Sequence, residues 1–182
     1  MVIVITGAIG IGKTTVCEKV IKIVQSSGYS CGGVLTYKGE HGSLIALDIQ
    51  TGERAILASA DNTFGGPRTP RYSFNPEAMK FGIRAINKAL DSDVLIIDEL
   101  GHLELDGEGF AKSLELVKTG KVRNAILVIR KRLLPDFLAR LGNNLVIFET
   151  TISTRDQLPR KICSSLIGNL LDSASSCAST RI

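Results

Sequence analysis

The sequence of 182 residues lacks any apolar run near the roughly 18 residues that a membrane-spanning helix needs. No basic leader with a small-residue cleavage site precedes the first apolar segment, so we expect neither membrane insertion nor secretion. The cysteines are few and far apart, and they form no CxxC or Cys/His spacing: Cys17, Cys31, Cys163 and Cys177. We therefore expect reduced thiols in a cytoplasmic protein, ahead of a disulfide framework or a zinc site.

Aromatic residues are also scarce, at 5% of the chain, and none lies within the local basic cluster of residues 118–132. Without aromatic side chains for base stacking, a solvated face explains this cluster better than nucleic-acid binding does. The modest net charge of +4 and the 44% hydrophobic content are ordinary for a globular protein. We expect one domain over residues 1–171 and a flexible, Ser/Ala-rich tail over residues 172–182.

What the sequence does contain is a phosphate-binding pattern at its start. An apolar run over residues 2–5 predicts a buried strand, the pattern GxxxxGK[ST] follows, and apolar residues then recur at helical spacing. This is the context of a phosphate-binding loop, or Walker A motif, in which glycines let backbone N–H groups surround an anion. Lys13 would reach the β- and γ-phosphates, and the Thr14 hydroxyl would bind Mg²⁺. The predicted nucleotide-binding residues of the loop are Gly7, Ala8, Ile9, Gly10, Ile11, Gly12, Lys13, Thr14 and Thr15.

The rest of the chain alternates between strand and helix patterns. We expect further strands at residues 31–36, 94–97, 124–129 and 144–148, with helices between them and a last helix from about residue 155. Two short runs at 43–49 and 54–58 predict an inserted β-hairpin, either an extension of the sheet or a flap over the site. Residues 59–75 predict a loop. The fold class is therefore α/β, a three-layer P-loop NTPase fold with a mainly parallel sheet and helices on both faces.

The helix that follows this loop has a clear start. Asn75 is a capping side chain, and a proline occupies the first helical position. The apolar residues Met79, Ile83, Ile86 and Leu90 recur at helical spacing, which predicts that they form its buried face.

A pair of acids ends the strand at residues 94–97. An acid at a strand end holds Mg²⁺ in P-loop proteins, so we expect Asp98 (Walker B motif) and Thr14 to form the metal site. Glu99 could orient a water molecule and take its proton, with Lys13 and Arg130 as catalytic cations. The alternative is that both acids only solvate the strand end. Glu99 directly after the metal acid suggests that one strand separates the two motif strands.

Several segments resemble the small nucleoside-triphosphatase family first described from thermophiles, known in animals as cancer-related nucleoside triphosphatase. They are GAIGIGKTT, IIDELGHLEL from Ile96 to Leu105, and GGVLT before the hairpin. The resemblance implies slow, Mg²⁺-dependent removal of the γ-phosphate from ATP, GTP, CTP and UTP by a monomer or weak oligomer. It implies a second wall of the nucleotide site formed by Leu95, Ile96, Ile97, Asp98, Glu99, Leu100, Gly101 and His102, and it carries over Arg155 from the closing segment. Glu104 matches a family acid without a role that we can assign, and His102 stands where the family commonly has Lys or Pro.

Two other functions stay open at this point. The chain could be a nucleoside or nucleotide kinase with a small acceptor, with the loop at residues 59–75 as its lid. It could instead be a nucleotide-dependent switch that binds RNA through the basic cluster of residues 118–132. Phosphate found on an organic acceptor would favour the first, and nucleotide-dependent, salt-sensitive RNA affinity the second.

Overall fold

The computed structural model describes residues 1–142 and 144–178, with side chains up to Leu171. Within these residues the strands form a single sheet with the order β5-β4-β3-β2-β6-β7-β1-β8. The strands are β1 (Val2–Gly7), β2 (Cys31–Lys38), β3 (Leu44–Asp48), β4 (Arg54–Ser59), β5 (Ser73–Phe74), β6 (Val94–Leu100), β7 (Ala125–Arg130) and β8 (Val146–Thr150). The α-helices are α1 (Lys13–Ser26), α2 (Pro76–Lys88), α3 (His102–Leu105), α4 (Ala111–Lys118), α5 (Leu134–Leu141) and α6 (Leu158–Ala178).

The sheet has a parallel part and an antiparallel part. Strands β2, β6, β7, β1 and β8 pair in parallel, so their carboxyl ends meet at one edge, where ligands bind in open α/β sheets. Strand β7 lies between β1 and β6, which confirms the predicted separation of the two motif strands by one strand. The predicted hairpin is β3 and β4, and it continues the sheet antiparallel to β2. It is thus an extension of the sheet and not a separate flap.

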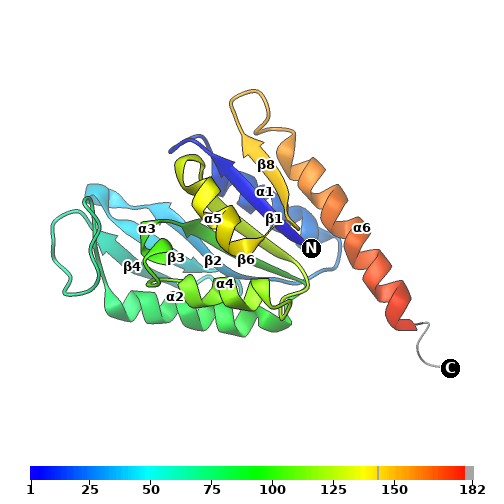
Figure 1. Ribbon diagram of the computed structural model, residues 1–182, viewed down its shortest axis with the longest axis horizontal. Helices are drawn as coiled ribbons and strands as arrows, with labels where there is room; N and C mark the ends of the chain where they lie inside the picture. Colours follow the sequence, from blue (N-terminus) through cyan, green and yellow to red (C-terminus); the bar gives the residue numbers. More distant parts are fainter. Residues whose placement is uncertain (143, 179–182) are drawn as a thin grey trace.

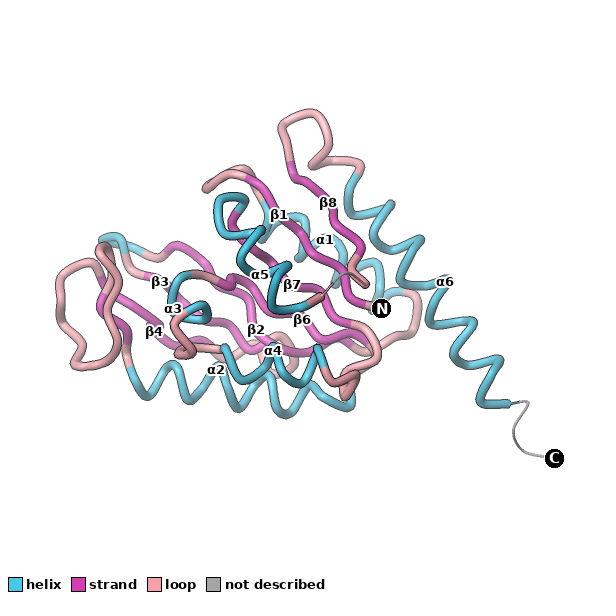
Figure 2. The backbone as a smooth tube through the Cα atoms, in the orientation of Figure 1, coloured by secondary structure: helices cyan, strands magenta, loops and turns pink. Residues whose placement is uncertain are grey.

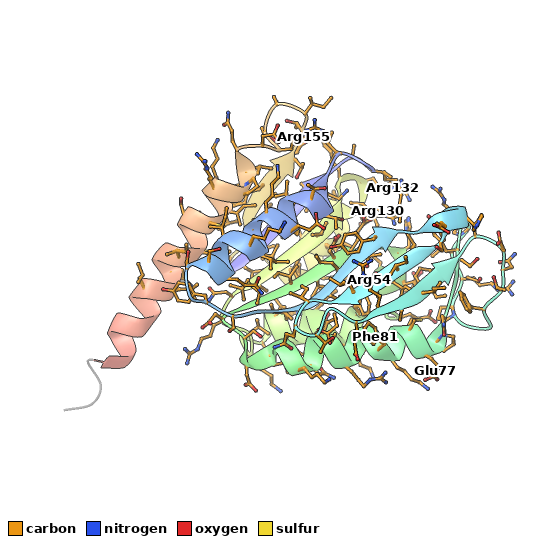
Figure 3. The ribbon with its side chains drawn as sticks, turned by 180° about the vertical axis from the view of Figure 1, so that it is seen from behind. Arg54, Glu77, Phe81, Arg130, Arg132 and Arg155 are labelled. Carbon is orange, nitrogen blue, oxygen red and sulfur yellow. The ribbon has the colours of Figure 1, made fainter. Side chains whose placement is uncertain are left out.

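Helices cover both faces of the sheet, as the alternating pattern predicts (Figure 1). One hydrophobic cluster joins α2, α4 and α5 to the sheet, and a second cluster joins α1 and α6 to the other face. The tube in Figure 2 shows the loops gathered around the ends of the central strands, and Figure 3, seen from behind, brings α1 to the front. Because the central strands are covered on both sides, β6 and β7 begin with continuous apolar runs instead of alternating ones.

Helix α2 begins as predicted, and its predicted apolar face packs against the hydrophobic core. The Asn75 side chain accepts hydrogen bonds from the backbone N–H groups of Glu77 and Ala78, so the predicted cap is confirmed. Of the predicted face, only Ile86 is fully buried, while Met79, Ile83 and Leu90 are partly exposed. Small residues are buried as well: Ala78, Gly82 and Ala85 of α2, and Ala89 directly after it. Small residues let the helix lie close to its neighbours, since a Cβ on Gly82 would lie 2.6 Å from the Phe110 ring.

The C-terminal helix is longer than the predicted domain boundary at residue 171. Helix α6 continues to Ala178, and residues 179–182 lie outside the described part, so the flexible tail stays a prediction. Cys17, Cys31 and Cys163 are free, buried thiols, and the Cys177 side chain lies outside the described residues. None of the helices in the described part of the chain is both long and apolar enough for a membrane crossing.

Candidate functional site

The phosphate-binding loop connects β1 to α1 at the carboxyl edge of the sheet. Gly10 and Gly12 have φ values of 77° and 106°, which side chains other than glycine rarely adopt, so the motif glycines shape the loop. Gly12 precedes α1 and has no side chain to cap it, so the first N–H groups of the helix remain directed at the loop. The buried Lys13 ammonium donates to the carbonyl oxygens of Ala8 at 2.9 Å and Gly7 at 3.3 Å. The loop therefore holds its lysine over the cradle.

A side-chain hydrogen bond joins the phosphate-binding loop to β6. The Thr14 hydroxyl donates to Oδ2 of Asp98 at 2.7 Å, across a sequence separation of 84 residues. On the other side, the Thr36 hydroxyl of β2 donates to the Asp98 backbone carbonyl at 2.5 Å. The two residues predicted as metal ligands are therefore in direct contact. Thr36 is a further positioning residue that no local sequence pattern marks.

Asp98 is suited to bind a cation. Its side chain is only 1% exposed, and its Oδ1 atom has no hydrogen-bond partner among the described residues. Burial, together with the nearby Glu99 charge, raises the pKa of Asp98 to about 7, although the Thr14 hydrogen bond opposes the rise. A buried carboxylate with a free oxygen beside a threonine hydroxyl is a donor set that Mg²⁺ accepts, with water and phosphate oxygens as its other ligands. The described residues hold no cluster of three His, Cys, Asp or Glu side chains that would serve as an all-protein metal site.

Glu99 and Arg130 meet at the ends of the neighbouring strands β6 and β7. The Arg130 guanidinium donates to the Glu99 carboxylate, and both side chains are about one quarter exposed, at 28% and 24%. The predicted base and the predicted catalytic cation thus form an ion pair beside the phosphate-binding loop. Figure 3 shows Arg130 and Arg132 near each other at this end of the sheet.

The segment after β6 is held in place by Glu104. Its buried carboxylate accepts from the backbone N–H of Gly101 at 2.7 Å and from that of Phe110 at 3.0 Å, so it closes the turn that contains α3. Burial raises the pKa of Glu104, and the two N–H donors oppose the rise. A Cβ on Gly109 would lie 2.2 Å from the Glu104 carboxylate, so the turn leaves space only for glycine there. Glu104 is thus a structural brace for this wall.

A cavity of about 640 Å³ opens between the phosphate-binding loop and the hairpin. Its inner end is polar, with Lys13, Thr14, Glu99 and Arg130. Its outer walls are mainly apolar and come from β3, β4, the loop at residues 59–75, α2 and the turn after β6. This volume is in the range of small-molecule sites. A second, more open hollow of about 530 Å³ borders the other flank of the loop, beside Ala8, Ile11 and residues 150–153.

The structure brings together only part of the predicted residue set. Leu95, Ile96, Ile97 and Leu100 are completely buried, so their side chains position the site from within the core and do not line it. Gly101 and His102 do line the cavity, and the exposed His102 ring lies 3.0 Å from the Arg132 guanidinium. Arg155 is exposed on the segment between β8 and α6, away from Arg130 in Figure 3, and it lines neither hollow.

Comparisons with known proteins agree on one group of relatives. A family model described as NTPase matches residues 2–163. Nucleoside-triphosphatase THEP1 of Methanosarcina barkeri is 30% identical over 168 residues, which cover 89% of this chain and 95% of that protein. The crystal structure of THEP1 from Aquifex aeolicus superposes with a TM-score of 0.74 at 27% identity, covering 91% of this chain and 99% of the other. The solution structure of a human cancer-related nucleoside triphosphatase shares the fold, with a TM-score of 0.67 at 20% identity and coverage of 90% and 96%.

Proposed function

The chain belongs to the NTPase family and is a nucleoside-triphosphatase, and we propose that it removes the γ-phosphate of ATP, GTP, CTP and UTP in a slow, Mg²⁺-dependent reaction. The products would be a nucleoside diphosphate and phosphate. The observation that carries this proposal is the hydrogen bond between Thr14 and Asp98, which joins the phosphate-binding loop to the acid of β6 at 2.7 Å.

Thr14 and Asp98 would hold the magnesium ion. Bound there with the triphosphate, the ion would neutralise charge on the β- and γ-phosphates. The free, buried Oδ1 of Asp98 supports this role, because a buried carboxylate oxygen without a hydrogen-bond partner is otherwise costly. The residues of the chain would contribute the cradle of loop N–H groups and the Lys13 ammonium, which would exchange its bonds to Gly7 and Ala8 for phosphate oxygens.

Glu99 would orient the attacking water and accept its proton. Its carboxylate lies next to the metal acid and lines the cavity at the end expected for the γ-phosphate. Arg130 holds this carboxylate in the absence of nucleotide. We infer that Arg130 turns part of its guanidinium to the γ-phosphate when nucleotide binds, which stabilises the charge of the transition state and releases a Glu99 oxygen for water. The need to rearrange this ion pair supports slow turnover.

Broad base specificity follows from which parts of the nucleotide the site contacts. The contacts described so far recognise phosphate and metal, which all nucleoside triphosphates share. On the side of the loop toward which the nucleoside would extend, the hollow is open and no aromatic side chain among the described residues lines it. We also expect a cytoplasmic protein, monomeric or weakly associating, that does not act through nucleic acid.

Phosphate release from each common nucleoside triphosphate, with Mg²⁺ and with a chelator, tests this function. We compare the native chain with Lys13→Ala, Glu99→Gln and, as a control, Glu77→Gln, whose carboxylate pairs with Lys80 on the exposed face of α2. Lys13→Ala should lose nucleotide affinity. Glu99→Gln should bind nucleotide but turn over at least about a hundredfold more slowly, as expected for loss of a general base. Glu77→Gln should behave as the native chain does.

Three outcomes would each contradict a part of the proposal. Phosphate release that persists in the chelator would exclude the magnesium requirement. Nucleotide binding without phosphate release from any triphosphate would exclude hydrolysis as the reaction of this site. Unchanged turnover in Glu99→Gln would remove Glu99 from the role of base.

A further inference from the structure

The two hollows beside the phosphate-binding loop cannot both serve the nucleoside of the triphosphate. Loop N–H groups of a P-loop cradle the α- and β-phosphates, the lysine reaches the β- and γ-phosphates, and the threonine hydroxyl lies at the metal between them. The γ-phosphate therefore belongs on the side of Asp98 and Glu99. The nucleoside part of the bound nucleotide therefore extends to the opposite side, toward the open hollow at residues 150–153. The larger cavity then extends beyond the γ-phosphate.

Water alone does not need this larger cavity. The apolar part of this cavity is lined by Leu44 and Leu57 of the hairpin, Tyr72 and Phe74 near β5, Met79 of α2 and Phe110 before α4. Tyr72 and Phe74 form an edge-to-face pair with ring centroids 6.4 Å apart. Aromatic walls of this kind bind flat rings by stacking and apolar contact. Thr36, Tyr37 and Thr69 also line the cavity, but their hydroxyl groups already have partners in Asp98, Glu18 and the backbone N–H of Tyr72.

Cationic side chains surround the cavity at both ends. Arg130 and Arg132 lie at its inner end, and Lys38 and the exposed Arg71 lie on its outer part, with the Arg71 guanidinium 5.4 Å from the centre of the Tyr72 ring. The acids on the wall are fewer. Glu104 is used up by its two backbone hydrogen bonds, and Glu99 is paired with Arg130. The remaining cationic groups therefore make the potential in the cavity positive, and such a potential attracts oxygen-rich molecules, whether neutral or anionic.

We propose that this cavity binds a nucleoside as a phosphoryl acceptor, so that the site transfers the γ-phosphate to an alcohol as well as to water. The proposal rests on the proposed binding of a magnesium nucleoside triphosphate at the phosphate-binding loop. The base of the acceptor nucleoside lies between the aromatic and aliphatic walls of the cavity, and the hydroxyl group of this nucleoside faces Glu99 at the inner end.

The step has the same balance as hydrolysis, with the alcohol in place of water. The hydroxyl oxygen forms a bond to the γ-phosphorus as its proton moves to the Glu99 carboxylate. The bond from the γ-phosphorus to the bridging oxygen of the β-phosphate breaks, and the nucleoside diphosphate leaves with that electron pair. The products are a nucleoside monophosphate and a nucleoside diphosphate. An occupied cavity also excludes water from the γ-phosphate, which favours transfer over hydrolysis.

The test follows the label of γ-³²P ATP with Mg²⁺ in the presence of each common ribonucleoside and deoxyribonucleoside. Label should appear in the monophosphate of at least one nucleoside, and the rate of free phosphate release should fall as that nucleoside saturates. Two variants of the same strand test the site. Leu57→Trp fills the cavity from β4, whereas Ile56→Trp points to the other side of the strand, where Ile56 is 53% exposed.

Leu57→Trp should lower acceptor labelling relative to phosphate release by at least about tenfold, in the range expected for altered pocket contacts. Ile56→Trp should keep the native ratio. Because Leu57 is buried, Met79→Trp from the half-buried side of α2 repeats the test if the first variant does not melt cooperatively.

The outcomes separate this inference from the proposed function. Phosphate release without label on any nucleoside overturns the acceptor site and leaves hydrolysis intact. Label on a nucleoside with no phosphate release in its absence supports the acceptor site and overturns hydrolysis as the function. Equal ratios in Leu57→Trp, Ile56→Trp and the native chain would show that any transfer occurs outside this cavity.

Discussion

Replacing Asp98 by asparagine should make the nucleotide-free protein relatively more stable as the pH rises. The Asp98 carboxyl is 1% exposed, and burial raises its pKa from an ordinary 3.8 to about 7. Between these values the folded protein keeps a proton that the unfolded chain has lost. The free energy of unfolding of the native chain therefore falls as the pH rises from about 4 to about 7. Asparagine does not titrate, so the free energy of unfolding of the variant does not fall in this way.

The size of the effect follows from the difference between the two pKa values. Each pH unit corresponds to about 1.4 kcal/mol, so burial of the Asp98 charge costs about 4 kcal/mol above pH 7. Between pH 5 and pH 8, the stability of the native chain relative to Asp98→Asn should fall by about 2–3 kcal/mol. The amide can still accept from Thr14, but its N–H group replaces the Oδ1 atom that lacks a partner. That change shifts the free energy of unfolding of the variant by an amount that does not vary with pH.

Urea unfolding of both chains without nucleotide, from pH 5 to pH 8, measures this difference. The pKa of Glu104 is also raised, but this residue is present in both chains, so its effect on the pH dependence of the unfolding free energy cancels in the comparison. Adding Mg²⁺ at pH 8 should then stabilise the native chain more than the variant, because only the carboxylate attracts the cation. A difference that does not depend on pH, or that changes in the opposite direction, would refute the assignment of Asp98 as a buried and uncompensated carboxylate.

Three further changes test the walls of the site. Glu104→Gln should lower the free energy of unfolding by about 1–3 kcal/mol in urea, because one backbone N–H of the pair at Gly101 and Phe110 loses its acceptor; unchanged stability would remove the brace. Gly82→Ala should destabilise by about 1–3 kcal/mol, because its Cβ would lie 2.6 Å from the Phe110 ring; a gain from helix propensity alone would contradict this packing. Arg130→Ala should lower kcat by at least about tenfold with little change in KM, and an unchanged kcat would leave the pair with Glu99 only structural.

The parts of the fold that sequence reasoning predicted well are those with local signals. The phosphate-binding loop, its flanking strand and helix, the hairpin and the cap at Asn75 each follow from residues close together in the chain. The position of one strand between β1 and β6 was suggested only by the glutamate that directly follows the metal acid, and the rest of the strand order was not predicted. Periodicity found the large apolar residues of α2 that pack on the core, but it did not mark the small buried residues, such as Gly82, through which the helix makes its closest approach.

The parts that could not be predicted depend on contacts between distant segments. Thr36 and Asp98 are separated by 62 residues, and nothing in the pattern of β2 marks that hydroxyl. The brace at Glu104 lies in α3, which has only four residues and therefore no periodicity. Its partner at the start of the turn is Gly101, so the Ser/Thr signal of a capping box is missing. The aromatic lining of the cavity likewise comes from a loop without a regular pattern.

The ion pair of Glu99 and Arg130 connects slow hydrolysis with the proposed acceptor. With only water beyond the γ-phosphate, Arg130 turns to that phosphate without a bound group that replaces its hydrogen bond to Glu99. An acceptor bound against the apolar walls brings its hydroxyl to Glu99 and replaces the lost hydrogen bond. Its binding energy is then used to reach the reactive arrangement, which is how remote contacts raise kcat. A nucleoside that lacks the reacting hydroxyl should accordingly bind in the cavity and slow phosphate release, whereas the complete nucleoside should speed the consumption of ATP. If both nucleosides slow it equally, the cavity binds a ligand but Glu99 does not serve it as a base.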